Sequence, residues 1–155
     1  MTDVVLGIDS STQSTKVEAR ELDSGNVLAS TSAPHPATTP PISEQDPGAW
    51  WEALVTACRD LPASVRDRVA AISVAGQQHG LVVVDRHGAS VRPAKLWNDT
   101  TSAAQATALV DALSPHGWAD ATGSLPVAAF TVSKLAWVAN NEREILGRVD
   151  KIMLP

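Results

Sequence analysis

The sequence predicts an α/β fold, and two observations support this prediction. Three short predicted strands separated by polar turns open the chain, and later strands alternate with segments of helical periodicity. The 155 residues suit one domain, and a composition of 44% hydrophobic and 19% charged residues is ordinary for a chain that builds its own core.

The first three strands are expected close together at the N-terminus. An apolar run from Val4 to Ile8 ends at Asp9, and a second strand is expected from about Thr15 to Glu21. Asp23 to Asn26 has the composition of a turn, and Val27 to Ser32 follows as the third strand. Short turns between consecutive strands predict an antiparallel meander.

A proline-rich loop and the first helix come next. Four prolines between residues 34 and 41 predict an extended loop. Asp46 is the expected N-cap of the helix and Pro47 its first residue, and helical spacing continues to about residue 61. We expect at least one of the pair Trp50 and Trp51 to lie on the buried face of this helix.

The rest of the chain is expected to alternate between strands and helices. Strands are expected at Val69–Val74, Leu81–Val84 and Val91–Trp97, the last two as a hairpin. Helices are expected from Thr101 or Ser102 to Leu113, over Thr131–Asn141, and over Glu142–Val149 after a break. The apolar run Ile152–Leu154 has no evident partner strand, so we expect residues 1–155 to be the front portion of a longer protein.

Charge and cysteine content exclude several classes of protein. Twelve basic against 17 acidic side chains give a net charge of -5, which disfavours nucleic-acid binding. The lone Cys58 cannot form an internal disulfide and is expected as a small buried hydrophobe. No stretch approaches the roughly 20 apolar residues of a membrane span. The N-terminus lacks a signal peptide, so a cytoplasmic location is expected.

The histidines and tryptophans outside the motifs are expected to have structural or passive roles. His35, His87 and His116 occur in predicted loops without metal-ligand spacing, and we expect them to be solvated. Trp118 and Trp137 are expected to serve packing.

The first candidate motif runs from Asp9 to Lys16. An aspartate that ends a buried strand and precedes a hydroxyl-rich turn suits a nucleotide phosphate and its Mg²⁺, because the carboxylate supplies a hard oxygen for the ion. Turn amides and hydroxyls can donate to phosphate oxygens, with Lys16 as a nearby positive charge. The residues fit a plain solvated turn equally well, and the glycine-lysine pattern of a P-loop is absent.

Two further motifs suit a sugar. Residues 76–80, Gly-Gln-Gln-His-Gly, offer directional donors and acceptors next to glycines that allow close approach of a ligand. Residues 95–99, Lys-Leu-Trp-Asn-Asp, combine an aromatic face with an amide and a carboxylate. A turn with a structural histidine and a core tryptophan before a helix cap remain alternative readings.

Taken together and in this order, the motifs resemble those of the FGGY carbohydrate kinases, members of the actin/hexokinase/Hsp70 superfamily. Residues 5–12, Val-Leu-Gly-Ile-Asp-Ser-Ser-Thr, look like the opening strand and turn of this family. Similarity to its xylulokinase branch extends to residues 43–47 with Trp50-Trp51, to 76–80, to 96–99 and to the tail 150–155. The resemblance implies an actin-like, RNase H-like domain, of which residues 1–155 form the N-terminal, sugar-binding part.

The resemblance also implies a role for each matching residue. Asp9 matches the residue that positions MgATP, so ATP and Mg²⁺ are the implied cofactors and Asp9 is both the catalytic and the metal candidate. The implied nucleotide contacts are Thr12, Gln13, Ser14 and Lys16. The implied ketose contacts are Gln78, His79, Trp97, Asn98 and Asp99. The implied substrate is D-xylulose and the implied product is D-xylulose 5-phosphate. A homodimer is the expected assembly of the full-length enzyme, and no nucleic-acid or membrane partner is expected.

Two positions depart from the family pattern. Ser11 stands where the family usually has glycine, which would strain the turn if φ there had to be positive. Gln78 stands where methionine is common and makes the implied sugar contact more polar.

The resemblance places the general base, a second phosphate motif and the adenosine site beyond residue 155. Phosphoryl transfer needs an oriented nucleophile and an assembled cradle for charge, so we expect these 155 residues alone not to catalyse.

Three alternatives stay open from the sequence. Other substrates of the same family are ribulose, gluconate and glycerol. An RNase H-like nuclease shares the strand order but needs several carboxylates around two metals. A catalytically silent sugar-binding or regulatory module is the third.

Overall fold

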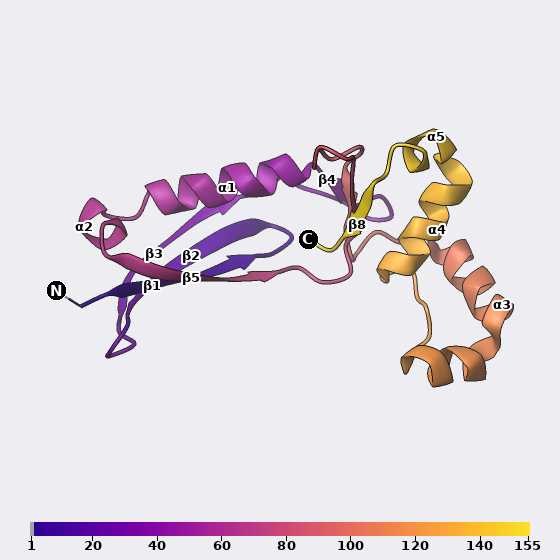
Figure 1. Ribbon diagram of the computed structural model, residues 1–155, viewed down its shortest axis with the longest axis horizontal. Coiled ribbons are helices and arrows are strands. Elements are labelled where there is room, and N and C mark those ends of the chain that lie inside the picture. The colour runs from indigo at the N-terminus through magenta and orange to yellow at the C-terminus, as the bar shows by residue number, and fades with distance from the viewer. Residues whose placement is uncertain (1) are drawn as a thin grey trace. The chain divides into compact units, whose positions relative to one another are not determined.

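The computed structural model describes residues 2–155, which form two compact units (Figure 1). Unit 1 comprises the chain up to Ala37 together with Gly48–Gln77. Unit 2 comprises Thr38–Pro47 and Gln78–Pro155.

Unit 1 is built on a four-stranded sheet with the order β3-β2-β1-β5. The antiparallel meander predicted from the sequence is confirmed in β1 (Val4–Ser10), β2 (Ser14–Glu21) and β3 (Val27–Pro34). β5 (Val69–Gly76) pairs parallel to β1, which a chain can do only after a long crossover. That crossover contains α1 (Pro47–Arg59) and the short α2 (Ala63–Arg66).

One face of the sheet carries the core of unit 1. Alternate residues of β1, Val4, Leu6 and Ile8, are buried because successive side chains of a strand point to opposite faces. They form one cluster with residues of β2 and with Ala53 and Ala57 of α1, which lies along the sheet in Figure 1. Small residues on the helix let its backbone approach the sheet closely.

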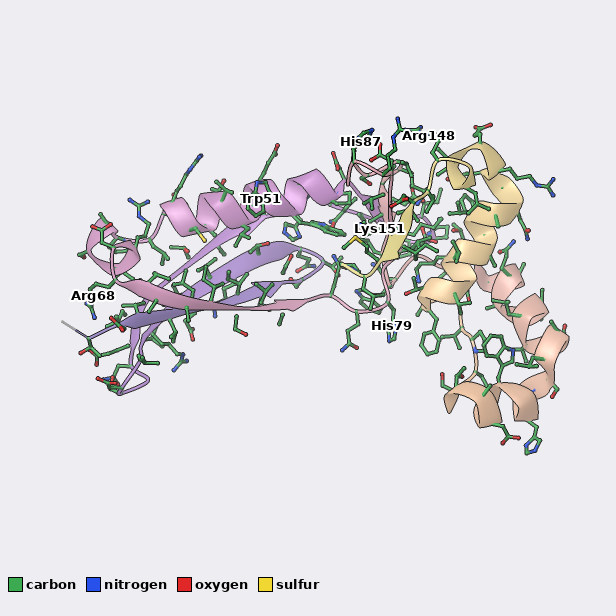
Figure 2. The ribbon with its side chains drawn as sticks, viewed as in Figure 1. Trp51, Arg68, His79, His87, Arg148 and Lys151 are labelled. Carbon is green, nitrogen blue, oxygen red and sulfur yellow. The ribbon has the colours of Figure 1, made fainter. Side chains whose placement is uncertain are left out.

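The prediction that a tryptophan of α1 lies on its buried face holds in part, because Trp50 has the helical spacing of the buried Ala53 and Ala57 but is not fully buried. Trp51, labelled in Figure 2, is 66% exposed, and Trp50 is only partly buried. Cys58 is partly buried against the core, as expected, and burial raises the pKa of its thiol.

The edge strand β5 leaves apolar side chains uncovered. Ile72 and Val74 are opposite Leu6 and Ile8 in the parallel register, yet they are 59% and 63% exposed. α1 therefore covers β1 and β2 and leaves this part of the same sheet open.

Unit 2 contains two small antiparallel pairs of strands and three helices. β4 (Glu44–Gln45) pairs with β7 (Ala94–Lys95), and β6 (Val82–Val84) pairs with β8 (Lys151–Met153). The core joins Leu81, Val83, Val91 and Val138.

Two strand predictions for unit 2 need correction. Ile152, expected to lack a partner, pairs with Val83 through β8. The expected strand Val91–Trp97 shrinks to β7, whose ladder partner is β4. The isolated bridge Leu81–Lys95 joins it to the residue before β6. The sequence signal failed here because both true partners are distant in the chain.

One helix of unit 2 has the predicted bounds, one is shorter than predicted and one is longer. α4 (Thr131–Asn141) has the predicted bounds, whereas the helix expected over Glu142–Val149 is only α5 (Arg143–Leu146), with Gly147 as its C-cap. α3 (Ala103–Thr122) runs nine residues past Leu113 in two segments, joined at Ser114 with φ 67° before Pro115 (Figure 1). Ser102 occupies the N-cap position but makes no capping bond, because its hydroxyl donates to the Ala128 carbonyl.

Among residues 2–155, no helix combines the length and apolar character that a membrane crossing needs.

Candidate functional site

Asp9 and Lys16 lie on the face of the unit 1 sheet opposite to α1. They face each other across the β1–β2 ladder, and both line a pocket with Gly7, Glu18, Ser73 and Ala75. Lys16 Nζ is 3.8 Å from a Glu18 carboxylate oxygen, an exposed pair that contributes little stability. The Asp9 carboxylate is exposed and has no hydrogen bond or ion pair with any described residue. It is therefore available to an incoming cation.

The β1–β2 turn is a tight loop held by its own backbone. Ser11 N–H donates to the Ser14 carbonyl at 3.0 Å, and the Ser11 hydroxyl donates to the same oxygen at 3.1 Å. Within residues 2–155 only His79 and Ser114 are non-glycine residues with positive φ, so Ser11 adopts an ordinary conformation. Serine in place of the family glycine therefore creates no backbone strain here.

The last strand of the sheet reaches the same turn. Gln77 N–H donates to the Ser10 carbonyl at 3.0 Å, and the Thr12 hydroxyl lies 3.5 Å from the Gln77 side-chain oxygen. β5 thus supports the loop on which the candidate nucleotide residues Thr12, Gln13 and Ser14 lie.

His35 supports this turn from the other side, and the prediction that it is solvated is wrong. His35 is buried, and its Nε2 is 2.9 Å from the Thr15 hydroxyl. Its backbone N–H donates to the Gln13 carbonyl at 2.8 Å. Burial lowers its pKa, an effect that backbone groups of Ser11 and Thr12 partly oppose. The residues around His35 in the sequence do not predict its burial, because His35 follows β3 and contacts the β1–β2 turn only through the pairing of strands in the sheet.

Segment 78–80 lies in unit 2, just before β6. Gln78 and His79 are exposed, and His79 has φ 61°, a left-handed conformation that is uncommon outside glycine (Figure 2). Its ring stacks on Phe130, with centroids 4.7 Å apart and planes at 27°. Sequence reasoning missed Phe130, which is 51 positions away.

Segment 97–99 shows a gradient of burial. Trp97 is 49% exposed, Asn98 is partly buried, and Asp99 has no exposed surface. Asp99 accepts from Ser43 N–H at 2.9 Å, from Thr101 N–H at 3.0 Å and from the Thr101 hydroxyl at 2.5 Å. Its internal partners fix the segment that carries Trp97.

Asp99 belongs to a buried network of charges. Lys95 Nζ is 3.3 Å from Asp99, 2.9 Å from Glu44 Oε1 and 4.0 Å from the centroid of the Trp137 ring, a cation–π contact. Burial raises the pKa of Asp99, but its hydrogen bonds and Lys95 outweigh this, so the net pKa is lowered and the carboxyl is ionised. Arg92 joins Glu44 and Glu142 at 2.7 Å each and so ties the junction of α4 and α5 to β4.

The candidate nucleotide residues and the candidate sugar residues belong to different units. Asp9, Lys16 and the β1–β2 turn lie in unit 1, and segments 78–80 and 97–99 lie in unit 2. Within unit 2 those two segments are brought together by Leu81 and Lys95, which exchange backbone hydrogen bonds of 2.8 and 3.2 Å.

The fold is that of FGGY sugar kinases, an actin-like α/β fold. Xylulose kinase from Bifidobacterium adolescentis superposes with a TM-score of 0.90 at 40% identity, covering 99% of this chain and 32% of that one. Glycerol kinase from Plasmodium falciparum with ADP shares the fold, with a TM-score of 0.83 at 23% identity over 99% of this chain and 32% of that one.

Residues 4–155 match the N-terminal domain of the FGGY family of carbohydrate kinases, and the chain belongs to this family. It is 46% identical to the xylulose kinase of Streptomyces rubiginosus over 153 residues and 39% identical to that of Escherichia coli over 158. These matches cover 98% and 97% of this chain. The chain spans about a third of the length of these relatives, 32% and 31%.

Proposed function

We propose that residues 1–155 are the N-terminal part of an ATP-dependent ketose kinase that converts D-xylulose to D-xylulose 5-phosphate in the cytoplasm. The observation that carries this proposal is the 46% identity to a xylulose kinase across 98% of the chain. Family membership favours the kinase over the nuclease and over a silent binding module. In the reaction a ketose hydroxyl oxygen bonds to the γ-phosphorus as the bond to the β-phosphate oxygen breaks, ADP leaves, and the hydroxyl proton passes to a base outside these residues.

The residues present in unit 1 fit MgATP. Mg²⁺ is usually held by one or two carboxylates together with substrate phosphates, and Asp9 is an exposed carboxylate without an internal partner. Among residues 2–155 no group of three or more His, Cys, Asp or Glu side chains could enclose a metal, which suits such a shared site. When bound, Mg²⁺ neutralises charge on the phosphate oxygens. Asp9 would hold it, the β1–β2 turn would donate to phosphate, and Lys16 would add positive charge.

Unit 2 would bind the ketose. Trp97 and His79 are both exposed, and Trp97 is two residues from Asp99, which the buried network holds in place. An aromatic face suits the C–H surface of a sugar, while imidazole and amide groups suit its hydroxyls. Because Asp99 is buried and bonded internally, we assign it to holding this surface, with Gln78, His79, Trp97 and Asn98 as the contacts.

The test is a coupled ADP-release assay of the full-length protein carrying this chain, with D-xylulose, D-ribulose, gluconate and glycerol. We expect kcat/KM to be at least about tenfold higher for D-xylulose, the discrimination that one or two hydroxyl contacts supply. His79→Ala should raise the ketose KM and leave the ATP KM nearly unchanged. Preference for another acceptor would refute the substrate, and absence of activity with all four would refute the kinase.

A further inference from the structure

The backbone at His79 is held in an unfavourable conformation by its surroundings. A non-glycine residue in the left-handed region costs about 1 kcal/mol and persists only where neighbours determine it. Gly80 is buried, and a Cβ there would lie 2.5 Å from Pro155 Cγ and 3.4 Å from the Lys95 carbonyl. The chain has no room to move at Gly80, directly after His79. The position of the His79 Cα is therefore set by the packing around Gly80.

Backbone packing does not orient the imidazole, which is exposed. An exposed side chain normally samples several rotamers, and fixing one needs a specific contact. The contact that the structure provides is the stack on Phe130, with a centroid distance of 4.7 Å and an angle of 27°. Such pairs contribute beyond their buried area, which is enough to favour one rotamer over the others.

Phe130 is partly buried, and buried groups of unit 2 hold the loop that precedes it. It occupies the N-cap position of α4, and the preceding carbonyls of Ala128 and Ala129 both accept from the ammonium of buried Lys134. The Ser102 hydroxyl also donates to the Ala128 carbonyl, at 3.0 Å. These buried bonds fix the loop before α4, so the phenyl ring is presented from a rigid support.

We propose that Phe130 is the positioning residue of the sugar site, whose ring holds the His79 imidazole in a single orientation for hydrogen bonding to a ketose hydroxyl. This rests on the proposed function, since it assigns the stack to the same site. A ring that held His79 only for stability would not need an exposed partner. In the stack, the partly buried ring of Phe130 contacts the His79 side chain, which faces solvent.

The first test is spectroscopic and needs no substrate. In the full-length protein labelled with ¹³C-histidine, the His79 signal is identified by its loss in His79→Gln. We expect Phe130→Leu to move this signal downfield, because the phenyl ring current is lost, and Phe130→Tyr to leave it nearly in place. An unchanged signal in Phe130→Leu would overturn the stack.

The second test is kinetic. Phe130→Leu should raise the ketose KM by roughly 2- to 10-fold, the equivalent of one aromatic pair, with the ATP KM unchanged, and Phe130→Tyr should restore it. Leu135→Ala is the matched control, because Leu135 lies on the helix that Phe130 precedes and packs against the core of unit 2. It should lower the melting temperature without a selective change in ketose KM.

The outcomes separate the two proposals. If Phe130→Leu and Leu135→Ala both lower stability and leave the ketose KM unchanged, Phe130 is structural and the inference fails. If the wild type phosphorylates no ketose while the His79 signal still moves in Phe130→Leu, the proposed function fails and the orientation of His79 by Phe130 stands.

Discussion

The β1–β2 turn of unit 1 and segment 97–99 of unit 2 are held in opposite ways. The turn is closed mainly by hydrogen bonds between residues three positions apart, with support from β5 and His35. Segment 97–99 depends on the charged side chains of Glu44 in β4 and Lys95 in β7, and on the Trp137 ring of α4 that Lys95 contacts. A local loop tolerates surface substitution, whereas a buried network fails when one partner is removed.

Removing the central carboxylate of the network should have the largest effect. Asp99→Ala leaves Lys95 and the Ser43 and Thr101 amides short of a buried partner, and we expect a loss of about 3–5 kcal/mol in unfolding free energy. Denaturant titration measures this. Asp120→Ala, at an exposed contact with His116, is the control and should change stability by less than about 1 kcal/mol. A stable Asp99→Ala that lost only ketose binding would instead make Asp99 a direct sugar contact.

The pH dependence of stability should report on the buried Lys134, which lies close to the network. Burial lowers its pKa from 10.5 to about 8, with Asp99 opposing and Lys95 reinforcing the shift. Below pH 8 the lysine is protonated in both the folded and the unfolded state, so the cost of burying the charge is present in full. Between pH 8 and 10.5 only the unfolded state stays protonated, so stability should rise with pH by about 3 kcal/mol relative to Lys134→Met. Parallel pH profiles of the two proteins would contradict this.

Asp9 tests the turn by chemistry. Asp9→Asn in the full-length protein should lower kcat by about 10² or more, as removal of one strong electrostatic contact does, while the melting temperature stays within a degree or two. Asp23→Asn, an exposed aspartate in the β2–β3 turn, should leave kcat unchanged. Normal kcat and normal Mg²⁺ dependence in Asp9→Asn would make the turn merely structural.

His35 should give the smallest effect. His35→Ala removes the bond to the Thr15 hydroxyl and leaves a small cavity below the turn, so we expect a loss of about 1–2 kcal/mol of stability. The ATP KM should rise a few-fold and the ketose KM should not. A selective change in ketose KM would show that the turn and the sugar residues are not separable as described.

Sequence reasoning succeeded where the cause of a structure is local. The meander, the bounds of α4 and the turn after Asp9 follow from alternation, helical spacing and turn residues over short windows. It failed where the partner is distant. Nothing near Ile152 indicates Val83, nothing near His79 indicates Phe130, and the proline-rich surroundings of His35 suggest solvent. The sequence motif around Trp97 and Asn98 indicates Asp99 as a sugar contact. Its burial, however, depends on its bonds to the distant Ser43 and to Lys95.

The open side of β5 bears on how these residues behave when isolated. A strand with unpaired backbone groups on one edge and bare Ile72 and Val74 on one face is a template for self-association. We therefore expect residues 1–155, produced alone, to aggregate or to be captured by chaperones at concentrations where the full-length protein stays dispersed. A charged substitution at Val74 should improve the solubility of the isolated segment. The exposed side chains of Ile72 and Val74 would therefore set the concentration at which this segment stays in solution.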